Sequence, residues 1–253
     1  MDSLTVASIS FVCIFGGAMF GLYVRSLLPG HHLTGVTMDT VKIAAGLIAT
    51  LAAMVLGLLV TSAKGTLDSM NSELTQEGVK VIIFDRVLKA YGPETQAIRA
   101  DLRNSVTSGI EMIWPEHENA TASIKAIEAR EGIERIQQGL RELSPRTDVQ
   151  RQLHSQALQL AAEMAQTRWL LIVQSAQPLP LPFLIVLLLW LTALFACIGL
   201  IAPGNPTNMS VLLICALSLS AAIFLIIEMS TPLTGIIKVS SAPLHKALAA
   251  IGK

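Results

Sequence analysis

The chain has 253 residues, and its 18 Lys and Arg balance 18 Asp and Glu, so the formal net charge is zero. Apolar residues make up 52% of the chain, charged residues only 14%, and the mean hydropathy is +0.59. A soluble domain carries about 25% charged residues. The composition therefore excludes an ordinary soluble domain and a disordered chain, and the charge balance removes the basic excess of a nucleic-acid-binding protein.

Four apolar stretches are each long enough to cross a bilayer core, which takes about 20 residues of helix. They cover residues 4–28, 41–63, 181–202 and 209–229. The first stretch is too long for a signal peptide, and no positive charge precedes it. We therefore expect it to be a retained span.

The first span contains small residues at a spacing that lets helices approach closely, namely Gly16, Gly17 and Gly21. The three cysteines of the chain all lie in apolar stretches, and none is spaced like a metal ligand. We expect them to act as small buried apolar side chains.

The second span carries small and hydroxyl-bearing residues along one face of the predicted helix. These residues recur every three or four positions and are Gly46, Thr50, Ala53, Gly57 and Thr61. One interpretation is close helix packing, which small residues permit. The other is the wall of a narrow pore, where Thr hydroxyls replace part of an ion's hydration shell. The two interpretations are compatible in an oligomer whose second spans surround an axis.

Beyond Lys64 the apolar residues continue at heptad spacing, which predicts a helix with one buried stripe. The main row is Leu67, Leu74, Val81 and Leu88. A second row, with Met70, Phe84 and Tyr91, is interrupted by Glu77 and Gly78. The second span therefore continues as one helix of about 50 residues that ends at Gly92-Pro93, a helix-stop pair. At 1.5 Å per residue it would project about 40 Å beyond the membrane.

Three more helices are predicted between this stop and the third span. One runs from Pro93 toward Trp114, the next covers residues 122–143 after a polar loop, and the last starts near Asp148. Three prolines at alternate positions in residues 174–182 separate the last helix from the third span. No segment alternates like a strand.

We therefore predict an all-α polytopic membrane protein with a helical bundle inserted between spans two and three. Its parts are spans one and two at 1–63, the bundle at 64–177, spans three and four at 178–230, and a tail at 231–253. Lys and Arg near span ends predict that both termini and the bundle are cytoplasmic. Those residues are Lys64, Arg168, Lys238 and Lys246.

Glu228 is the acidic residue that lies deep in an apolar stretch, close to the end of the fourth span. Ionisable groups inside membranes usually face protein or water. One interpretation is a boundary residue that reaches headgroup water or pairs with Lys238, Arg168 or Lys42. The other is a carboxylate in an ion pathway.

The sequence contains no catalytic constellation. It has no nucleophile elbow, no phosphate-binding glycine loop, and no Cys/His pair suited to nucleophilic catalysis. Its five histidines have no partners at metal-ligand spacing. We therefore predict neither enzymatic activity nor a cofactor or metal site.

Two blocks of sequence resemble a known family. The first joins residues 57–64 with residues 88–95 and Arg99; the second runs through residues 182–184, 195–200, 223–229 and 232–244. In this order, and most specifically in the stretch from Pro232 to Leu244, the chain is similar to the bestrophin-like family of bacterial membrane proteins.

The resemblance implies a place in the bacterial inner membrane and a distant similarity to bestrophins. Those proteins are pentameric channels with four spans per subunit, cytoplasmic termini and a pore lined by the second span. The resemblance therefore implies a homo-oligomer, with a pentamer favoured, that passes an inorganic ion. The second span here has no bulky apolar neck on its small-residue face, which leaves the gate unplaced. The chain also has no acidic cluster comparable to the bestrophin calcium clasp, so we expect no calcium dependence.

Two functions are carried forward. The first is an oligomeric ion channel whose pore is lined by the second span. The alternative is a non-conducting membrane scaffold or accessory subunit, whose weakly acidic bundle docks a protein partner. Ion flux through purified protein in liposomes distinguishes them.

Overall fold

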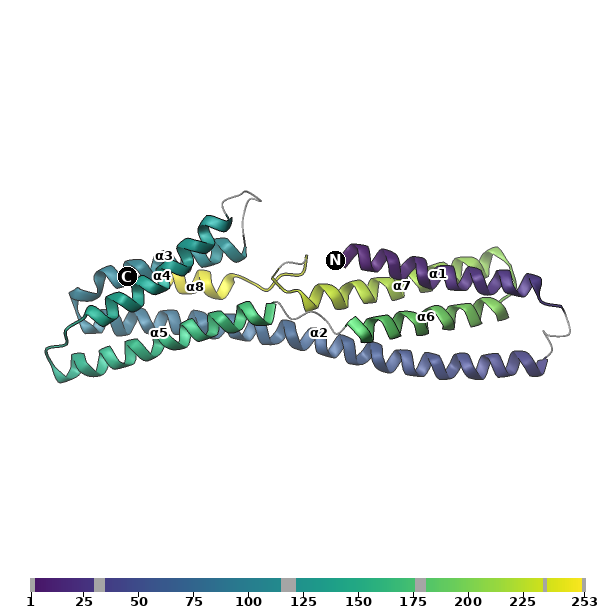
Figure 1. Cartoon of the computed structure of the whole chain (residues 1–253), viewed down its shortest axis with the longest axis horizontal. Coiled ribbons are helices and arrows are strands. Elements are labelled where there is room, and N and C mark those ends of the chain that lie inside the picture. The colour runs from purple at the N-terminus through teal and green to yellow at the C-terminus, as the bar shows by residue number, and fades with distance from the viewer. Residues whose placement is uncertain (1–2, 30–34, 115–121, 176–180, 234–235, 252–253) are drawn as a thin grey trace. The chain divides into compact units, whose positions relative to one another are not determined.

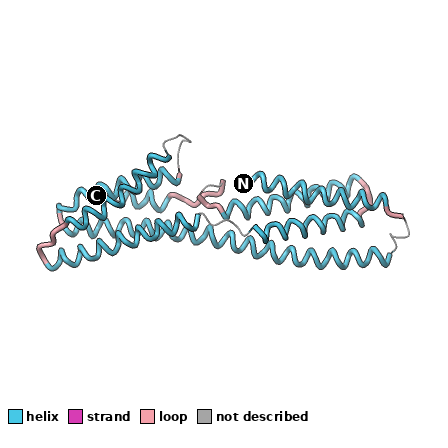
Figure 2. Tube along the Cα trace, viewed as in Figure 1, coloured by secondary structure: helices cyan, strands magenta, loops and turns pink. Residues whose placement is uncertain are grey.

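The computed structural model describes residues 3–29, 35–114, 122–175, 181–233 and 236–251. Within these residues every regular element is a helix and there is no strand (Figure 2). The all-α class predicted from the sequence is confirmed. The chain divides into two compact units, which we call unit 1 (residues 1–67 and 178–237) and unit 2 (residues 68–177 and 238–253).

Unit 1 contains the helices that can cross a membrane (Figure 1). They are α1 (Ser3–Leu27), α2 (Gly35–Tyr91), α6 (Leu181–Ile201) and α7 (Pro206–Ser230), and α2 extends past the end of unit 1 into unit 2. Each is long and apolar enough to span a bilayer. The four predicted spans are therefore confirmed, with ends that differ by a few residues from those expected.

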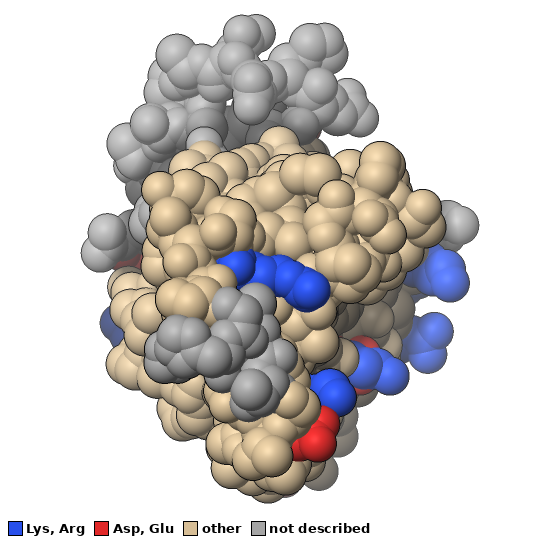
Figure 3. All heavy atoms as spheres, turned by 90° about the vertical axis from the view of Figure 1, so that its right-hand side faces the viewer, with Lys and Arg blue, Asp and Glu red and all other residues tan. Residues whose placement is uncertain are grey.

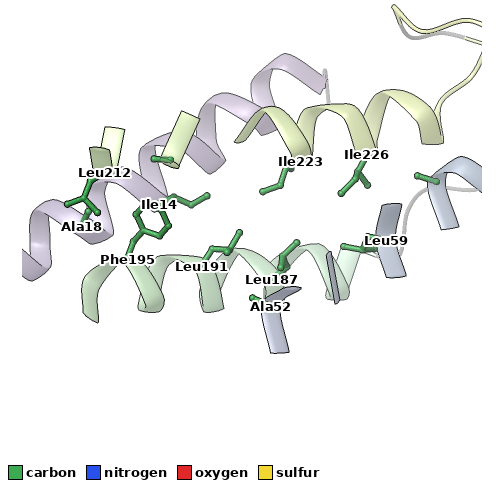
Figure 4. Packing of buried hydrophobic residues seen from close by; sticks show 12 residues of the cluster. Ile14, Ala18, Ala52, Leu59, Leu187, Leu191, Phe195, Leu212, Ile223 and Ile226 are labelled. Carbon is green, nitrogen blue, oxygen red and sulfur yellow. The ribbon is translucent and has the colours of Figure 1, made fainter. Parts of the chain in front are cut away.

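The interior of unit 1 is filled by apolar side chains from all four helices (Figure 4). Helix α1 packs against both α6 and α7. Ile14 of α1 lies beside Phe195 of α6, and Ile223 and Ile226 of α7 point toward the same interior. Helix α2 contributes Ala52 and its neighbours on one face. Dispersion forces in such close packing drive helix association in lipid, where no hydrophobic effect separates the helices from their solvent.

Glycines bring the backbones of α1 and α6 into contact. A Cβ on Gly17 would lie 2.6 Å from the Thr192 carbonyl oxygen, and one on Gly21 would overlap the Ala196 carbonyl. In return, a Cβ on Gly199 of α6 would overlap the Ala18 carbonyl. The expected close approach is confirmed at Gly17 and Gly21. It is wrong for Gly16, which is exposed and has nothing within 4 Å of an added Cβ among the described residues, because it points away from α6.

The surface of unit 1 is apolar. Large exposed apolar side chains occur on every one of its helices, including Leu4, Ile43, Leu189 and Leu217. Figure 3 views the end of unit 1 at which α6 is joined to α7, and few atoms on this face belong to Lys, Arg, Asp or Glu. A bilayer, or a second copy of the chain, is the environment that such a surface requires.

Helix α2 is one continuous helix of 57 residues, in agreement with the heptad pattern. It ends at Tyr91 because Gly92 has a φ of +139°, which residues with a Cβ rarely adopt. The 3₁₀ turn η2 (Pro93–Thr95) follows at once. The Thr95 hydroxyl donates to the Leu88 carbonyl at 2.6 Å, which satisfies one of the open carbonyls at the end of α2.

Unit 2 packs the last part of α2 against α3 (Gln96–Ile113), α4 (Ala122–Glu142) and α5 (Asp148–Ser175). The three helices begin and end close to the positions predicted from the sequence. Their buried apolar residues form one core: Phe84, Val87, Leu88, Ile98, Leu102, Ile136, Leu140, Ala157 and Ala161.

The C-terminal segment is divided between the two units. Residues up to Ile237 belong to unit 1, whereas residues from Lys238 onward belong to unit 2. There α8 (Ala242–Ala250) packs on α3, and Ala247 and Ile251 are buried with Val81. The indole N–H of Trp114 donates to the Val239 carbonyl at 2.8 Å. Val239, Ala247 and Ile251 are thus buried in unit 2, in a segment for which the sequence predicted only a tail.

Candidate functional site

The five residues predicted to face a pore all lie on an exposed face of α2. Gly46, Thr50, Ala53, Gly57 and Thr61 are each exposed to solvent in the single chain. Among the described residues, nothing lies within 4 Å of a Cβ added to either glycine. We call these five residues the small-residue face of α2. The structure brings them together along one helix and leaves them uncovered.

The small-residue face is separated from the face that α2 buries in unit 1. Ala45, Ala52, Leu59 and Ala63 are all buried, at less than a tenth of their full exposure. At 3.6 residues per turn, the small-residue face is centred about 135° away from them. A third face carries large exposed side chains: Leu47, Met54 and Leu58. The membrane part of α2 therefore packs one face against its own chain. It leaves two faces exposed, one with small side chains and one with large side chains.

The two threonines of the small-residue face direct their hydroxyl protons along the helix. Thr50 donates to the Gly46 carbonyl and Thr61 donates to the Gly57 carbonyl, both at 2.9 Å. A hydroxyl oxygen has two acceptor lone pairs besides its one donor. Because each hydroxyl proton is already donated to a carbonyl of the same helix, the hydroxyl oxygen can act only as an acceptor toward a ligand outside the helix. At the glycine positions, the helix backbone lies close to the surface.

Glu228 is held by donors from two other segments of unit 1. The side chain is 1% exposed and lies near the end of α7. One carboxylate oxygen accepts from the Ser3 hydroxyl. The other accepts from the backbone N–H of Ile236 and, at 3.2 Å, from that of Ile237. These partners are not the cations named in the sequence analysis, since a hydroxyl and two backbone amides bind the carboxylate.

The contacts of Glu228 give it a positioning role. The carboxylate ties the first turn of α1 to the segment that follows α7. Buried polar groups are costly without hydrogen bonds, and here both oxygens have them. These hydrogen bonds account for the burial of the carboxylate, and its place in an ion pathway stays a prediction.

Unit 2 contains a buried ion pair that links α2 to α3. The carboxylate of Asp85 accepts from Arg99 Nε at 2.7 Å and from a second guanidinium nitrogen at 3.0 Å. Asp85 is 5% exposed. The hydrogen bond to Asp85 raises the pKa of Arg99, so the guanidinium keeps its positive charge. It fixes α3 against α2 after the turn at Gly92.

No metal site is present in the part of the chain that the structure describes. There, no group of three or more His, Cys, Asp or Glu side chains is placed to hold an ion. The cysteines Cys13, Cys197 and Cys215 are free thiols, and the expected burial is wrong for Cys215, which is exposed in the single chain.

Sequence reasoning missed three of these contacts. The Asp85–Arg99 pair had a signal, because Asp85 lies beside the buried row at Phe84 and Leu88. Ser3 as a partner of Glu228 had none, since the two are 225 positions apart. The interruption of the second heptad row at Gly78 is explained by the C-terminal segment, because a Cβ there would lie 2.9 Å from the Pro243 carbonyl oxygen.

The fold and the site define a class: a helical membrane protein with four candidate spans and a helical unit inserted between the second and third. The model of the bestrophin-like domain matches residues 12–244, which is nearly the whole chain. The protein belongs to the bestrophin-like family, as the resemblance of its sequence blocks indicates. Comparison with curated proteins and with solved structures gives no match.

Proposed function

We propose that the protein is an oligomeric ion channel whose pore is lined by the small-residue face of α2. The proposal starts from membership of the bestrophin-like family, which is distantly similar to pentameric channels. The observation that carries it is the uncovered state of Gly46, Thr50, Gly57 and Thr61 on a membrane helix. Small side chains leave room along an axis, and hydroxyl oxygens replace part of an ion's hydration shell.

The packing of unit 1 argues that conduction needs several copies. Its interior is filled by apolar side chains such as Ile14, Leu187 and Ile223, which are fully buried. Moving an ion through such a core would leave it unsolvated, at a cost of many kcal/mol. An ion path between copies avoids that core. The bestrophin plan favours five copies, with both termini and residues 64–177 cytoplasmic in the bacterial inner membrane.

The test is thiol modification of a conducting preparation. Cys13, Cys197 and Cys215 are first replaced by Ser, and Thr61→Cys is then introduced. A charged, water-soluble thiol reagent is expected to reduce ion flux into liposomes, because it places bulk and charge in the pore. The matched control is Leu58→Cys, on the bulky face of the same helix, 59% exposed in the single chain. Its flux should stay unchanged.

Three results would contradict the proposal. Liposomes that stay tight under every ion gradient would favour the scaffold function instead, in which the helical unit docks a protein partner. Equal inhibition at Leu58 and Thr61 would remove the assignment of the pore to the small-residue face. Native mass spectrometry in nanodiscs counts the copies, and a monomer would exclude a shared pore.

A further inference from the structure

A polar contact joins α2 to α5 inside unit 2, beyond the apolar part of α2. Lys80 Nζ donates to the Thr167 hydroxyl at 3.2 Å and lies 3.7 Å from the Glu163 carboxylate. Glu77 is one turn before Lys80 on α2, and Arg168 follows Thr167 on α5. Two cations and two carboxylates thus meet where these helices pack.

Glu77 is the group in this contact that lacks a full set of partners. Its Oε2 atom is buried and has no hydrogen-bond partner among the described residues. Burial raises the pKa of Glu77 to about 7, although Lys80 and Arg168 each pull it down. Burial also lowers the pKa of Arg168, and the charge of Glu77 opposes that shift. Desolvation therefore outweighs attraction at Glu77.

The C-terminal segment crosses α2 at the next residue. Gly78 is buried, and a Cβ on it would lie 2.9 Å from the Pro243 carbonyl oxygen. One turn further on, Val81 packs against Ala247 and Ile251. A change in the solvation of Glu77 therefore acts where both α5 and the C-terminal segment are held.

The other titratable groups on these elements are accounted for. Glu73, one turn before Glu77, also has a buried Oε2, and this residue takes part in a further interaction. Glu163 and Arg168 are the charged groups that α5 brings to the contact. On the C-terminal segment, His245 and Lys246 are exposed to solvent. Glu77, with one buried and unpartnered carboxylate oxygen, is therefore the group whose protonation changes the charge of the contact.

We propose that Glu77 is a proton-operated element in unit 2, which holds α5 and the C-terminal segment on α2 when protonated and loosens them when ionised. The ionised carboxylate needs hydration that the closed contact does not supply, so opening is favoured. The neutral acid has no such need. This inference goes beyond the channel proposal and does not depend on whether the chain conducts.

The direction with pH follows from linkage. The pKa of Glu77 lies at about 7 in the folded chain and near its ordinary value of 4.5 when the group is solvated. Between these values the closed state binds more protons than the open state. Closure is therefore most stable below about pH 4.5 and weakens as pH rises toward 7, with no further change from this group above that value.

The test measures amide hydrogen exchange in the full chain in nanodiscs between about pH 5 and about pH 8, corrected for intrinsic exchange. In the wild type, the opening constant of α5 and α8 amides is expected to rise about 70-fold over this range, because the pKa of Glu77 is 4.5 in the open state and about 7 in the closed state. Glu77→Gln should remove most of that rise. The matched control is Glu134→Gln, at an exposed acid of unit 2, and should leave it unchanged. A rise that persists in Glu77→Gln would overturn the proposal.

A second variant keeps the test decisive if Glu77→Gln does not fold. Arg168→Gln removes a cation that favours ionised Glu77, so the midpoint of the transition should move up by about one pH unit. Infrared difference spectra of the carboxylic acid stretch give the same midpoint without relying on exchange. The control is Arg141→Gln, at an exposed cation of α4. A midpoint that does not move, or moves down, in Arg168→Gln contradicts the assignment to Glu77.

Discussion

At the scale of single residues, the buried polar groups show how local chemistry is satisfied over long sequence distances. Glu228 and Asp85 are both almost fully buried, but they are stabilised differently. Asp85 has a charged partner 14 positions away on the next helix. Glu228 has neutral donors, from the start of α1 and from the segment after α7. Glu228 stood out in the sequence as an acidic residue in an apolar stretch, whereas its partners did not.

Glu228→Ala is expected to destabilise unit 1 by about 2 kcal/mol, because it removes the charged acceptor of the Ser3 hydroxyl and of the Ile236 and Ile237 N–H groups. Reversible unfolding in mixed micelles measures the change. Ser3→Ala should cost less, about 1 kcal/mol, since only one hydroxyl bond is lost. Ser8→Ala is the control, since Ser8 is exposed and bonds only to its own helix. Unchanged stability in Glu228→Ala, with altered ion flux, would instead support an ion pathway.

Arg99→Ala is expected to destabilise unit 2 by about 3 kcal/mol, because the buried Asp85 carboxylate loses both of its hydrogen bonds to the guanidinium. Arg99→Lys should recover part of the loss, since an ammonium keeps the charge but cannot bind the carboxylate with two nitrogens. Denaturant unfolding of the variants, monitored by hydrogen exchange of α3 amides, gives the midpoints to be compared. Equal stability of the alanine and lysine variants would mean that the charge contributes nothing.

At the scale of elements, the sequence pattern predicted which segments form helices, but it did not predict which helices contact one another. The four spans, the length of α2 and the bounds of α3, α4 and α5 agree with hydropathy, heptad spacing and the Gly-Pro stop. These features depend on periodicity within one helix. For the α1–α6 contact, the sequence predicted only that α1 has small residues able to pack closely. Which helix packs there, and which glycines make the contact, depends on how α1 is rotated about its axis.

Gly21→Ala is expected to disrupt the α1–α6 contact, because its Cβ would overlap the Ala196 carbonyl and the backbones would have to separate. Overpacking of this kind costs about 1–3 kcal/mol or more. Gly16→Ala is the matched control on the same helix, with free space around its Cβ, and should change stability by less than about 1 kcal/mol. Thermal unfolding of both variants in nanodiscs measures the difference in stability. A similar loss of stability in Gly21→Ala and Gly16→Ala would contradict the assigned contact.

At the scale of the whole molecule, the chain order is not the order of the compact units. Unit 1 joins residues 1–67 with residues 178–237, unit 2 joins residues 68–177 with residues 238–253, and α2 contributes to both. The C-terminal segment completes the core of unit 2 through Ala247 and Ile251. A division into consecutive parts, with a separate tail at 231–253, therefore misses the role of the last residues.

Ending the chain at Ile237 is expected to destabilise unit 2, because it uncovers Val81 and removes the acceptor of the Trp114 indole. Amides of α3 should exchange at least about tenfold faster, whereas those of α1 and α6 keep their protection, since their packing partners remain. Lys246→Gln is the control, as the side chain is exposed on α8. Unchanged exchange in α3 would show that α8 contributes no stability there.

The sequence by itself determined the helical class, the four spans, the long second helix and the membership of a family. These depend on composition, period and local stop signals, which act over one or two helical turns. The tertiary structure decided which face of α2 is buried, that Glu228 is bound by Ser3 and the 236–237 amides, and that the last helix lies beside Gly78. Such contacts depend on how helices rotate and pack, and apolar surfaces carry no charge pattern that would specify their partners in advance.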